Sequence, residues 1–243
     1  FAVARQAAWE GAKVSMASRS KTNIEEAASK IREETGAEVL ASVMDVTDTA
    51  SIEDWTRNTL DAFQSIDGLV INAGGPPAGK FDDLRETDWE KGFRLTLLST
   101  VRLIRSVLPF MRSAQKGSIL AITSVAVKEP IDVLLLSNVM RSGVTSLLKS
   151  LSTDLAANNI RVNNLVPGLF GTERLMELDK RYSREWRVSL DEVQKINFDN
   201  IPLGRYGEPD ELGKAAVFLL SDAASYITGE TFIIDGGKTR TVW

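Results

Sequence analysis

The sequence predicts an α/β protein built on a single doubly wound parallel sheet with helices on both faces. Short apolar runs alternate with longer amphipathic stretches along the chain, the pattern of parallel strands joined by crossover helices. The 243 residues are 43% apolar and 26% charged, which suits a globular chain long enough to bury one large core. No linker or internal repeat interrupts the pattern, so 1–243 is expected to be one domain.

Each expected element has a local signal. Gly36 ends the first expected helix, capping boxes at 51–54 and 87–90 begin the next two, and Pro209 begins the last. Strands are expected at 12–18, 37–45, 67–75, 117–124, 160–168 and 231–237. Helices are expected at 23–36, 51–63, 87–111, 134–157 and 209–222.

Residues 170–200 are the one long excursion from this alternation. The segment is rich in charge and follows the end of an expected strand, a position typical of a substrate lid, although a surface decoration fits the same pattern. Its basic side chains could attract an acidic substrate, or they could form solvated helix faces balanced by nearby acids. The basic residues are Arg174, Lys180, Arg181, Arg184 and Arg187, and the acids are Glu173, Glu177, Asp179 and Glu185.

Composition excludes several kinds of chemistry. The chain has no cysteine and no histidine, which rules out disulfides, Ser–His and Cys–His nucleophiles and the usual zinc sites, and no metal site is expected. The net charge is −4 without a basic stripe, so no nucleic-acid partner is expected. No apolar run is long enough for a membrane span, and a cytoplasmic location is expected.

Small residues, hydroxyls and glycines recur where the expected strands end. In an open parallel sheet the carboxyl ends of the strands form the ligand-binding edge. One such cluster is weak evidence, because any strand-to-helix turn favours these residues, but five in register predict a ligand site. The clusters are ASRS at 17–20, MDVTD at 44–48, NAGG at 72–75, TSVA at 123–126 and VPGLFGT at 166–172.

These clusters resemble the motifs of the short-chain dehydrogenase/reductase family, and the resemblance spans essentially the whole chain. It implies a Rossmann-like fold, a nicotinamide dinucleotide laid across the strand ends, and a small-molecule carbonyl or alcohol substrate. The C-terminal part is similar to members named 3-oxoacyl reductase or glucose dehydrogenase. The matching segments are Asn72–Gly74, Ser124, Arg161–Asn163, Pro167, Gly168, Thr172, 201–222 and 227–237.

The resemblance also implies the cofactor-binding residues. NADP(H) is favoured over NAD(H), because Ser18 stands where NAD-preferring relatives carry an acid and Arg19 suits a 2′-phosphate; Arg19 could also be a solvated surface residue. Asn72 would lie near the adenine ribose, or would tie neighbouring strands by a structural hydrogen bond. The full set is Ser18, Arg19, Asp45, Val46, Asn72, Ala73, Gly74, Arg141, Pro167, Gly168 and Thr172.

The chain begins at Phe1 inside an amphipathic helical pattern, without a signal-peptide pattern. By resemblance, the first strand and the Gly-rich phosphate loop are expected to be absent from the given chain. Family members also pair through the helices expected at 87–111 and 134–157, which implies a homo-oligomer, either a dimer or a tetramer.

The catalytic group departs from the family pattern. Family members use Asn, Ser, Tyr and Lys; here the corresponding residues are Thr96, Ser124, Ser137 and Arg141. An aliphatic hydroxyl is a far poorer acid than a phenol, and arginine keeps its proton where lysine can exchange one. Losing a positioned acid or base typically lowers the rate by about 10²–10⁴.

Three hypotheses follow from this substitution. The protein is an oxidoreductase in which Ser124, Ser137 and Arg141 polarise the carbonyl, while water or a lid residue such as Tyr182 supplies the proton. Alternatively, it is a dinucleotide-binding pseudoenzyme that acts as a sensor or partner subunit. In the third hypothesis its ligand is not a dinucleotide.

Overall fold

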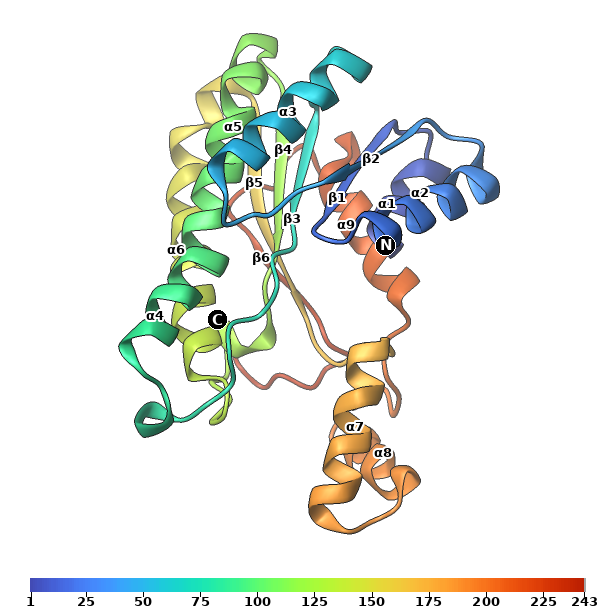
Figure 1. Cartoon of the computed structure of the whole chain (residues 1–243), viewed down its shortest axis with the longest axis vertical. Helices are drawn as coiled ribbons and strands as arrows, with labels where there is room; N and C mark the ends of the chain where they lie inside the picture. Colours follow the sequence, from blue (N-terminus) through green and yellow to red (C-terminus); the bar gives the residue numbers. More distant parts are fainter. Residues whose placement is uncertain (243) are drawn as a thin grey trace.

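The computed structural model describes residues 1–242 and confirms the α/β class, with parallel strands and helices on both sides (Figure 1). All strand pairs are parallel, as expected for strands joined by crossover helices. The strands are β1 Val14–Ser18, β2 Val39–Val43, β3 Gly68–Ile71, β4 Gly117–Ile122, β5 Ile160–Pro167 and β6 Thr231–Ile234.

Within the described residues the parallel strands form two sheets. β1 and β2 form a two-stranded sheet, whereas β3, β4, β5 and β6 form a separate four-stranded sheet in that order. β1 pairs only with β2 and β3 only with β4, so each has one edge without a strand partner within residues 1–242. Helices join the two sheets instead: α3 contacts β2 and α5, and α1 contacts α2 and α9.

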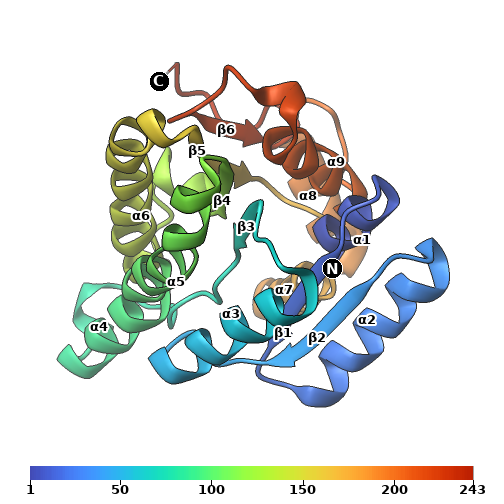
Figure 2. The same ribbon diagram turned by 90° about the horizontal axis from the view of Figure 1, so that it is seen from above.

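The helices cover the sheets in two layers. α5 and α6 lie on one face of the four-stranded sheet and α9 on the other (Figure 2). The helices are α1 Ala2–Trp9, α2 Lys21–Thr35, α3 Thr49–Phe63, α4 Glu86–Gly92, α5 Ser99–Ala114, α6 Leu135–Asp154, α7 Glu173–Trp186, α8 Leu190–Asp199 and α9 Pro209–Leu220. In the part of the chain that the structure describes, none of these is both long and apolar enough to cross a bilayer.

Both expected capping boxes are wrong. Asp48 caps α3, its carboxylate accepting from the Ala50 amide at 3.1 Å, while the Ser51 hydroxyl accepts from the Asp45 amide at 3.0 Å. The helix expected from residue 87 begins at Glu86, where Asp88 accepts from the Arg85 amide. In each place a carboxylate outside the expected pair accepts an amide at the helix start: Asp48, three residues before Ser51, and Asp88, two residues before Glu90.

The helix expected at 87–111 is also divided. A π-helical turn at Phe93–Leu98 separates α4 from α5 and contains Thr96. Such π-turns widen the helix by one residue and frequently occur at functional sites.

The main core lies between the four-stranded sheet and helices α5 and α6. Every residue of β4 is buried, and Ile119 and Val162 of the sheet pack in the same cluster as Met111 of α5 and Leu148 of α6. Burial of these side chains between the sheet and the two helices holds β4 and α6 rigidly together. The residues at the carboxyl end of β4 are therefore presented from a fixed framework.

Segment 170–200 folds into helices α7 and α8, which project beyond the carboxyl end of β5 (Figure 1). The expectation that its acids are all solvated is wrong for Asp179, which is fully buried. Its carboxylate accepts hydrogen bonds from Tyr206 Oη at 2.8 Å and Asn197 Nδ2 at 3.3 Å. This network ties α7 to α8 and to the loop before α9, because a buried carboxylate must find donors.

Candidate active site

Arg141 joins the carboxyl ends of β3 and β4 to helix α6. Its Nε donates to Ser137 Oγ at 3.2 Å, one helical turn away. Its Nη1 donates to the carbonyl oxygens of Ile122 and Thr123, at 3.2 and 3.3 Å. Its Nη2 donates to the carbonyl oxygen of Ala73 at 3.5 Å. The structure thus brings two of the expected catalytic residues together at the strand ends.

The Arg141 guanidinium keeps unused capacity for a ligand. A guanidinium has five N–H donors, and the four hydrogen bonds above leave one Nη2 hydrogen without an acceptor among residues 1–242. Burial lowers the pKa of Arg141, and the charge of Arg174 lowers it further. The pKa of a guanidinium begins so high that Arg141 stays charged.

The other expected catalytic residues line the same region. Ser124 Oγ accepts from the Ala126 amide at 3.2 Å, which leaves its hydroxyl hydrogen available. The Thr96 side chain is buried, and its hydroxyl has no hydrogen-bond partner within the described chain. Thr96 and Arg141 both line a cavity of about 10 Å³, close to the smallest volume that holds one water molecule.

The expected cofactor edge has open space at the end of β3. A side chain at Gly74 would meet no atom within 4 Å, and Asn72 is exposed. Across residues 1–242, the Asn72 side chain makes no hydrogen bond, so its alternative role as a tie between strands is not seen. A small residue and a free amide at this edge fit the approach of a nucleotide.

Four further expected residues, Ser18, Arg19, Asp45 and Val46, lie where β1 and β2 end in parallel register. Ser18 Oγ donates to the Ser20 carbonyl oxygen at 3.0 Å. The amide and the hydroxyl of Thr47 lower the pKa of Asp45, and the charge of Arg19 contributes to the same shift. Arg19 is exposed and forms no ion pair in the described residues, so its guanidinium is free to meet a phosphate. Val46 follows Asp45 and is partly buried.

The residues expected at the nicotinamide end have structural duties as well. Gly168 follows Pro167 at the end of β5, and a Cβ at Gly168 would lie 2.5 Å from Asp235 Cβ. Glycine is therefore required there for close packing between the ends of β5 and β6. Thr172 caps α7, its hydroxyl accepting from the Leu175 amide at 3.3 Å. Sequence reasoning predicted neither duty.

Comparison with known proteins agrees with this arrangement. A family model described as enoyl-(acyl carrier protein) reductase matches residues 1–239. The chain is 33% identical over 238 residues to dehydrogenase/reductase SDR family member 4 of Oryctolagus cuniculus, covering 98% of this chain and 88% of that protein. The chain belongs to the short-chain dehydrogenase/reductase family.

Two solved structures of the family are similar along nearly the whole chain. L-sorbose reductase of Gluconobacter frateurii, complexed with NADPH and L-sorbose, has a TM-score of 0.94 at 28% identity, covering 99% of this chain and 92% of that chain. An NADPH-bound short-chain oxidoreductase of Pseudomonas aeruginosa PAO1, described as containing an atypical catalytic center, has a TM-score of 0.90 at 26% identity. That comparison covers 99% of this chain and 92% of that chain.

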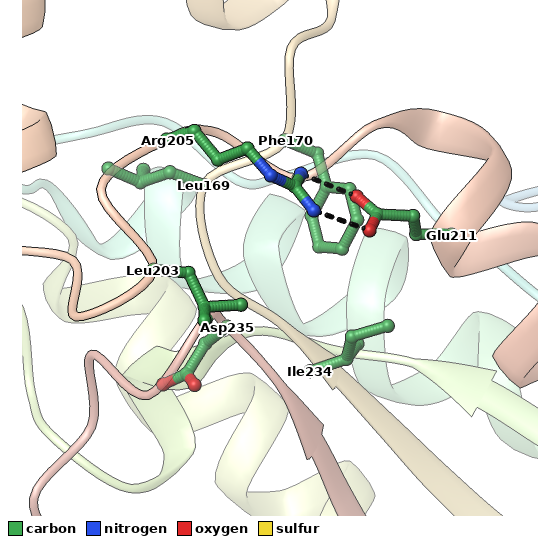
Figure 3. A pocket seen from close by; sticks show the side chains of 9 residues that line it. Leu169, Phe170, Leu203, Arg205, Glu211, Ile234 and Asp235 are labelled. Carbon is green, nitrogen blue, oxygen red and sulfur yellow. Dashed lines mark hydrogen bonds and ion pairs between the residues drawn. The ribbon is translucent and has the colours of Figure 1, made fainter.

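A second cavity lies at the base of segment 170–200 and is distinct from this family site. Figure 3 shows its lining, in which Arg205 and Glu211 form a paired contact with donor–acceptor distances of 2.8 and 2.7 Å. Hydrogen bonds from Arg205 and then from the Glu208 amide lower the pKa of Glu211 to about 2. The cavity is about 80 Å³, well below the roughly 300–1,000 Å³ of ordinary ligand pockets. We therefore assign it to the packing of the loops.

Sequence reasoning did not single out Arg174 from the other basic residues of its segment. The structure places its guanidinium over Gly75, with Nη2 3.5 Å from the position that a Cβ on Gly75 would take. Only the approach of its side chain to Gly75 distinguishes Arg174, and no local sequence pattern reveals that approach.

Proposed function

We propose that this family member is an NADP(H)-dependent oxidoreductase that interconverts a small carbonyl compound and its alcohol with an altered proton-transfer group. The observation that carries the proposal is the Arg141 guanidinium, which lies at the strand ends, is hydrogen-bonded to Ser137 and has one N–H without an acceptor among residues 1–242. When bound, a nicotinamide cofactor supplies or accepts the hydride.

In this proposal the chain's own residues polarise the substrate. The Ser124 and Ser137 hydroxyls would donate to the carbonyl oxygen, and the adjoining positive charge of Arg141 would stabilise the negative charge that develops on that oxygen. Arg141 would not deliver a proton, because its pKa is too high for exchange at neutral pH. The proton would come from water, and the cavity beside Thr96 is the candidate position for that water.

Tyr182 is the other candidate for the proton donor. Its ring stacks on Trp186 with centroids 4.8 Å apart. It lies eight residues beyond Arg174 on α7, which corresponds to about 12 Å along the helix axis. Tyr182 would therefore need a movement of α7 to reach Arg141, and water is the simpler donor.

The preference for NADP(H) rests on Arg19. An exposed guanidinium at the end of β1, beside a hydroxyl rather than a carboxylate at Ser18, suits the 2′-phosphate. The two solved relatives above are NADPH complexes, which supports a phosphorylated cofactor. We propose that the dinucleotide as a whole is bound by the residues expected from the sequence, from Ser18 to Thr172.

We further propose a single cytoplasmic domain that forms a homo-oligomer through α4, α5 and α6. Support for the oligomer comes from large apolar side chains exposed on or beside these helices, namely Phe93, Phe110 and Val139. Exposed apolar residues on neighbouring elements are typical of interfaces.

A pseudoenzyme is the alternative function, and one observation favours it. Three backbone carbonyls already accept hydrogen bonds from Arg141, so this residue also serves to hold β3, β4 and α6 together. A protein that binds the cofactor without turnover would retain such a contact.

Steady-state NADPH oxidation with a panel of ketones and aldehydes tests the proposal. We expect slow turnover by the wild type, faster turnover by the double variant Ser137→Tyr/Arg141→Lys, and no change in Ser150→Tyr at the exposed end of α6. NADPH binding without turnover in either protein would favour the pseudoenzyme. No binding of NADPH or NADH would favour a ligand that is not a dinucleotide.

A further inference from the structure

Two guanidinium groups converge at the end of β3. Arg174 approaches Gly75 from α7, with Nη2 3.5 Å and Nη1 4.0 Å from the position of an added Cβ. Arg141 approaches from α6 and donates to the carbonyl oxygen of Ala73, two residues earlier. The two arginines come from helices that are far apart in the sequence and meet over the same short stretch of backbone.

Neither arginine has an anionic partner among the described residues. The ion pairs of residues 1–242 include neither Arg141 nor Arg174. Arg174 makes no side-chain hydrogen bond there, so its five donors and the one remaining Nη2 hydrogen of Arg141 are available. By contrast, Arg181 and Arg205 in the same region each pair with a glutamate.

The position of Arg174 is electrostatically unfavourable without a ligand. It lies in the first turn of α7, where the helix dipole is positive and disfavours a cation by about 0.3–1 kcal/mol. The charge of Arg174 also reaches Arg141, whose pKa it lowers. Glu173 precedes Arg174, but adjacent helical residues do not face each other. A bound anion would relieve both repulsions.

We propose that Arg141 and Arg174 together bind a carboxylate of the substrate, so that the protein acts on oxo acids and the corresponding hydroxy acids. This inference rests on the proposed oxidoreductase function and names its substrate class. Arg174 offers the planar fork that binds a carboxylate through two parallel hydrogen bonds, and Arg141 adds a third donor. Because Ser137 and Ser124 adjoin Arg141, the substrate carbonyl would lie beside its own carboxylate.

The same donors could instead bind a phosphate of the cofactor. We assign them to the substrate because Arg141 is bonded to Ser137, one of the residues expected to contact the reacting carbonyl. The two sources make different predictions, since a phosphate contact would change NADPH affinity with every substrate.

The test compares Arg174→Gln with wild type on acid and ester pairs. The probes are 2-oxobutanoate, 3-oxobutanoate and 4-oxopentanoate, each beside its methyl ester, which keeps the ketone and removes the charge. We expect the wild type to prefer at least one acid over its ester by about tenfold or more in kcat/KM. In Arg174→Gln the preference should fall to about threefold or less through a higher KM, with ester turnover unchanged. Arg174→Lys should be intermediate, because it keeps the charge and loses the fork.

The matched control is Lys180→Gln, which removes the same charge from an exposed position on α7 that has no ion pair in the described residues. It should retain the preference of the wild type. A wild type that uses the ester as well as the acid would overturn the inference and leave the oxidoreductase function intact. The inference would also be overturned if Arg174→Gln weakened NADPH binding by the same factor as it lowered kcat/KM for the acids. The anion bound by Arg174 would then be a phosphate of the cofactor.

A second readout does not depend on turnover. Calorimetric titration of the three oxo acids is carried out on the protein alone and with NADP⁺, a pairing in which no hydride can transfer. Acid binding that is lost in Arg174→Gln and kept in Lys180→Gln supports the carboxylate site at Arg141 and Arg174 even if every turnover assay is silent and the proposed function fails. No acid binding in either titration overturns it.

Discussion

The substitution Gly74→Ala separates a cofactor groove from an ordinary loop. A Cβ at Gly74 would meet no protein atom within 4 Å, and the residue does not have the positive φ that would strain alanine. The folded protein itself should therefore accept the methyl group. Replacing glycine by alanine at a compatible position stabilises a protein by about 0.4–1 kcal/mol. For a chain of this size that corresponds to an increase in Tm of about 1–4 °C.

Binding of the cofactor should change in the opposite direction. If a dinucleotide passes over Gly74, the added methyl group would overlap the bound cofactor. Overpacking of that kind costs about 1–3 kcal/mol, which would be lost from the binding free energy. The Kd for NADPH should then rise by about 5- to 150-fold, since each 1.4 kcal/mol is about tenfold. Fluorescence titration with NADPH measures this change, and a thermal melt without cofactor measures stability.

Gly68→Ala is the matched control, at the opposite end of the same strand. Its Cβ would make an ordinary contact, 3.6 Å from Leu220 Cδ2, and NADPH binding should be unchanged. Wild-type affinity for NADPH in a stably folded Gly74→Ala protein would refute the reasoning. It would mean that the open space at the end of β3 is not where the cofactor lies.

Two further predictions concern the network of segment 170–200 and the choice of cofactor. Tyr206→Phe leaves the buried carboxylate of Asp179 without its nearest donor. It should lower the free energy of unfolding, measured by urea denaturation, by about 1–3 kcal/mol. The control Tyr226→Phe, at a fully exposed position, should have no effect. Burial raises the pKa of Tyr206 to about 12, above the value of about 10 for an unfolded tyrosine. Its contribution is therefore complete below about pH 10 and is lost as the pH rises towards 12, so the stability difference between wild type and Tyr206→Phe should shrink across that interval. A difference that is constant from pH 9 to 12, by the same denaturation, would contradict this account. Arg19→Gln should raise the Kd for NADPH by about tenfold, which corresponds to the loss of roughly one charge-assisted hydrogen bond. The Kd for NADH should be unchanged. Equal effects on the Kd of both cofactors in the titration would exclude a role of Arg19 in binding the 2′-phosphate.

The sequence predicted the type and order of the main elements correctly, because each depends on local periodicity. The alternation of apolar runs and amphipathic stretches located all six strands, and Gly36 and Pro209 marked helix limits that the structure confirms. The expected capping boxes failed because Asp48 and Asp88 accept the amides at the two helix starts, while Ser51 accepts from the Asp45 amide outside the helix.

The sequence could identify Ser137 and Arg141 as a pair, because four-residue spacing places them on one helix face whatever the rest of the fold does. It could not predict that three carbonyls would accept from Arg141, since those carbonyls lie at or just beyond the ends of β3 and β4, 18 to 68 residues away in the chain. The buried Asp179 was also beyond local reasoning, because its donors come from Asn197 and Tyr206, 18 and 27 residues away.

The α/β class and the family could be read from the amino-acid sequence alone, and the correspondence of Ser137 and Arg141 to the family's tyrosine and lysine stays a prediction from that sequence. These follow from short-range spacing and from which residue types are present. The open edge at Gly74 and the approach of Arg141 and Arg174 to that edge could be learned only from the folded structure. Each of these depends on which strand ends and helix starts become neighbours, and that is set by packing between segments far apart in the chain.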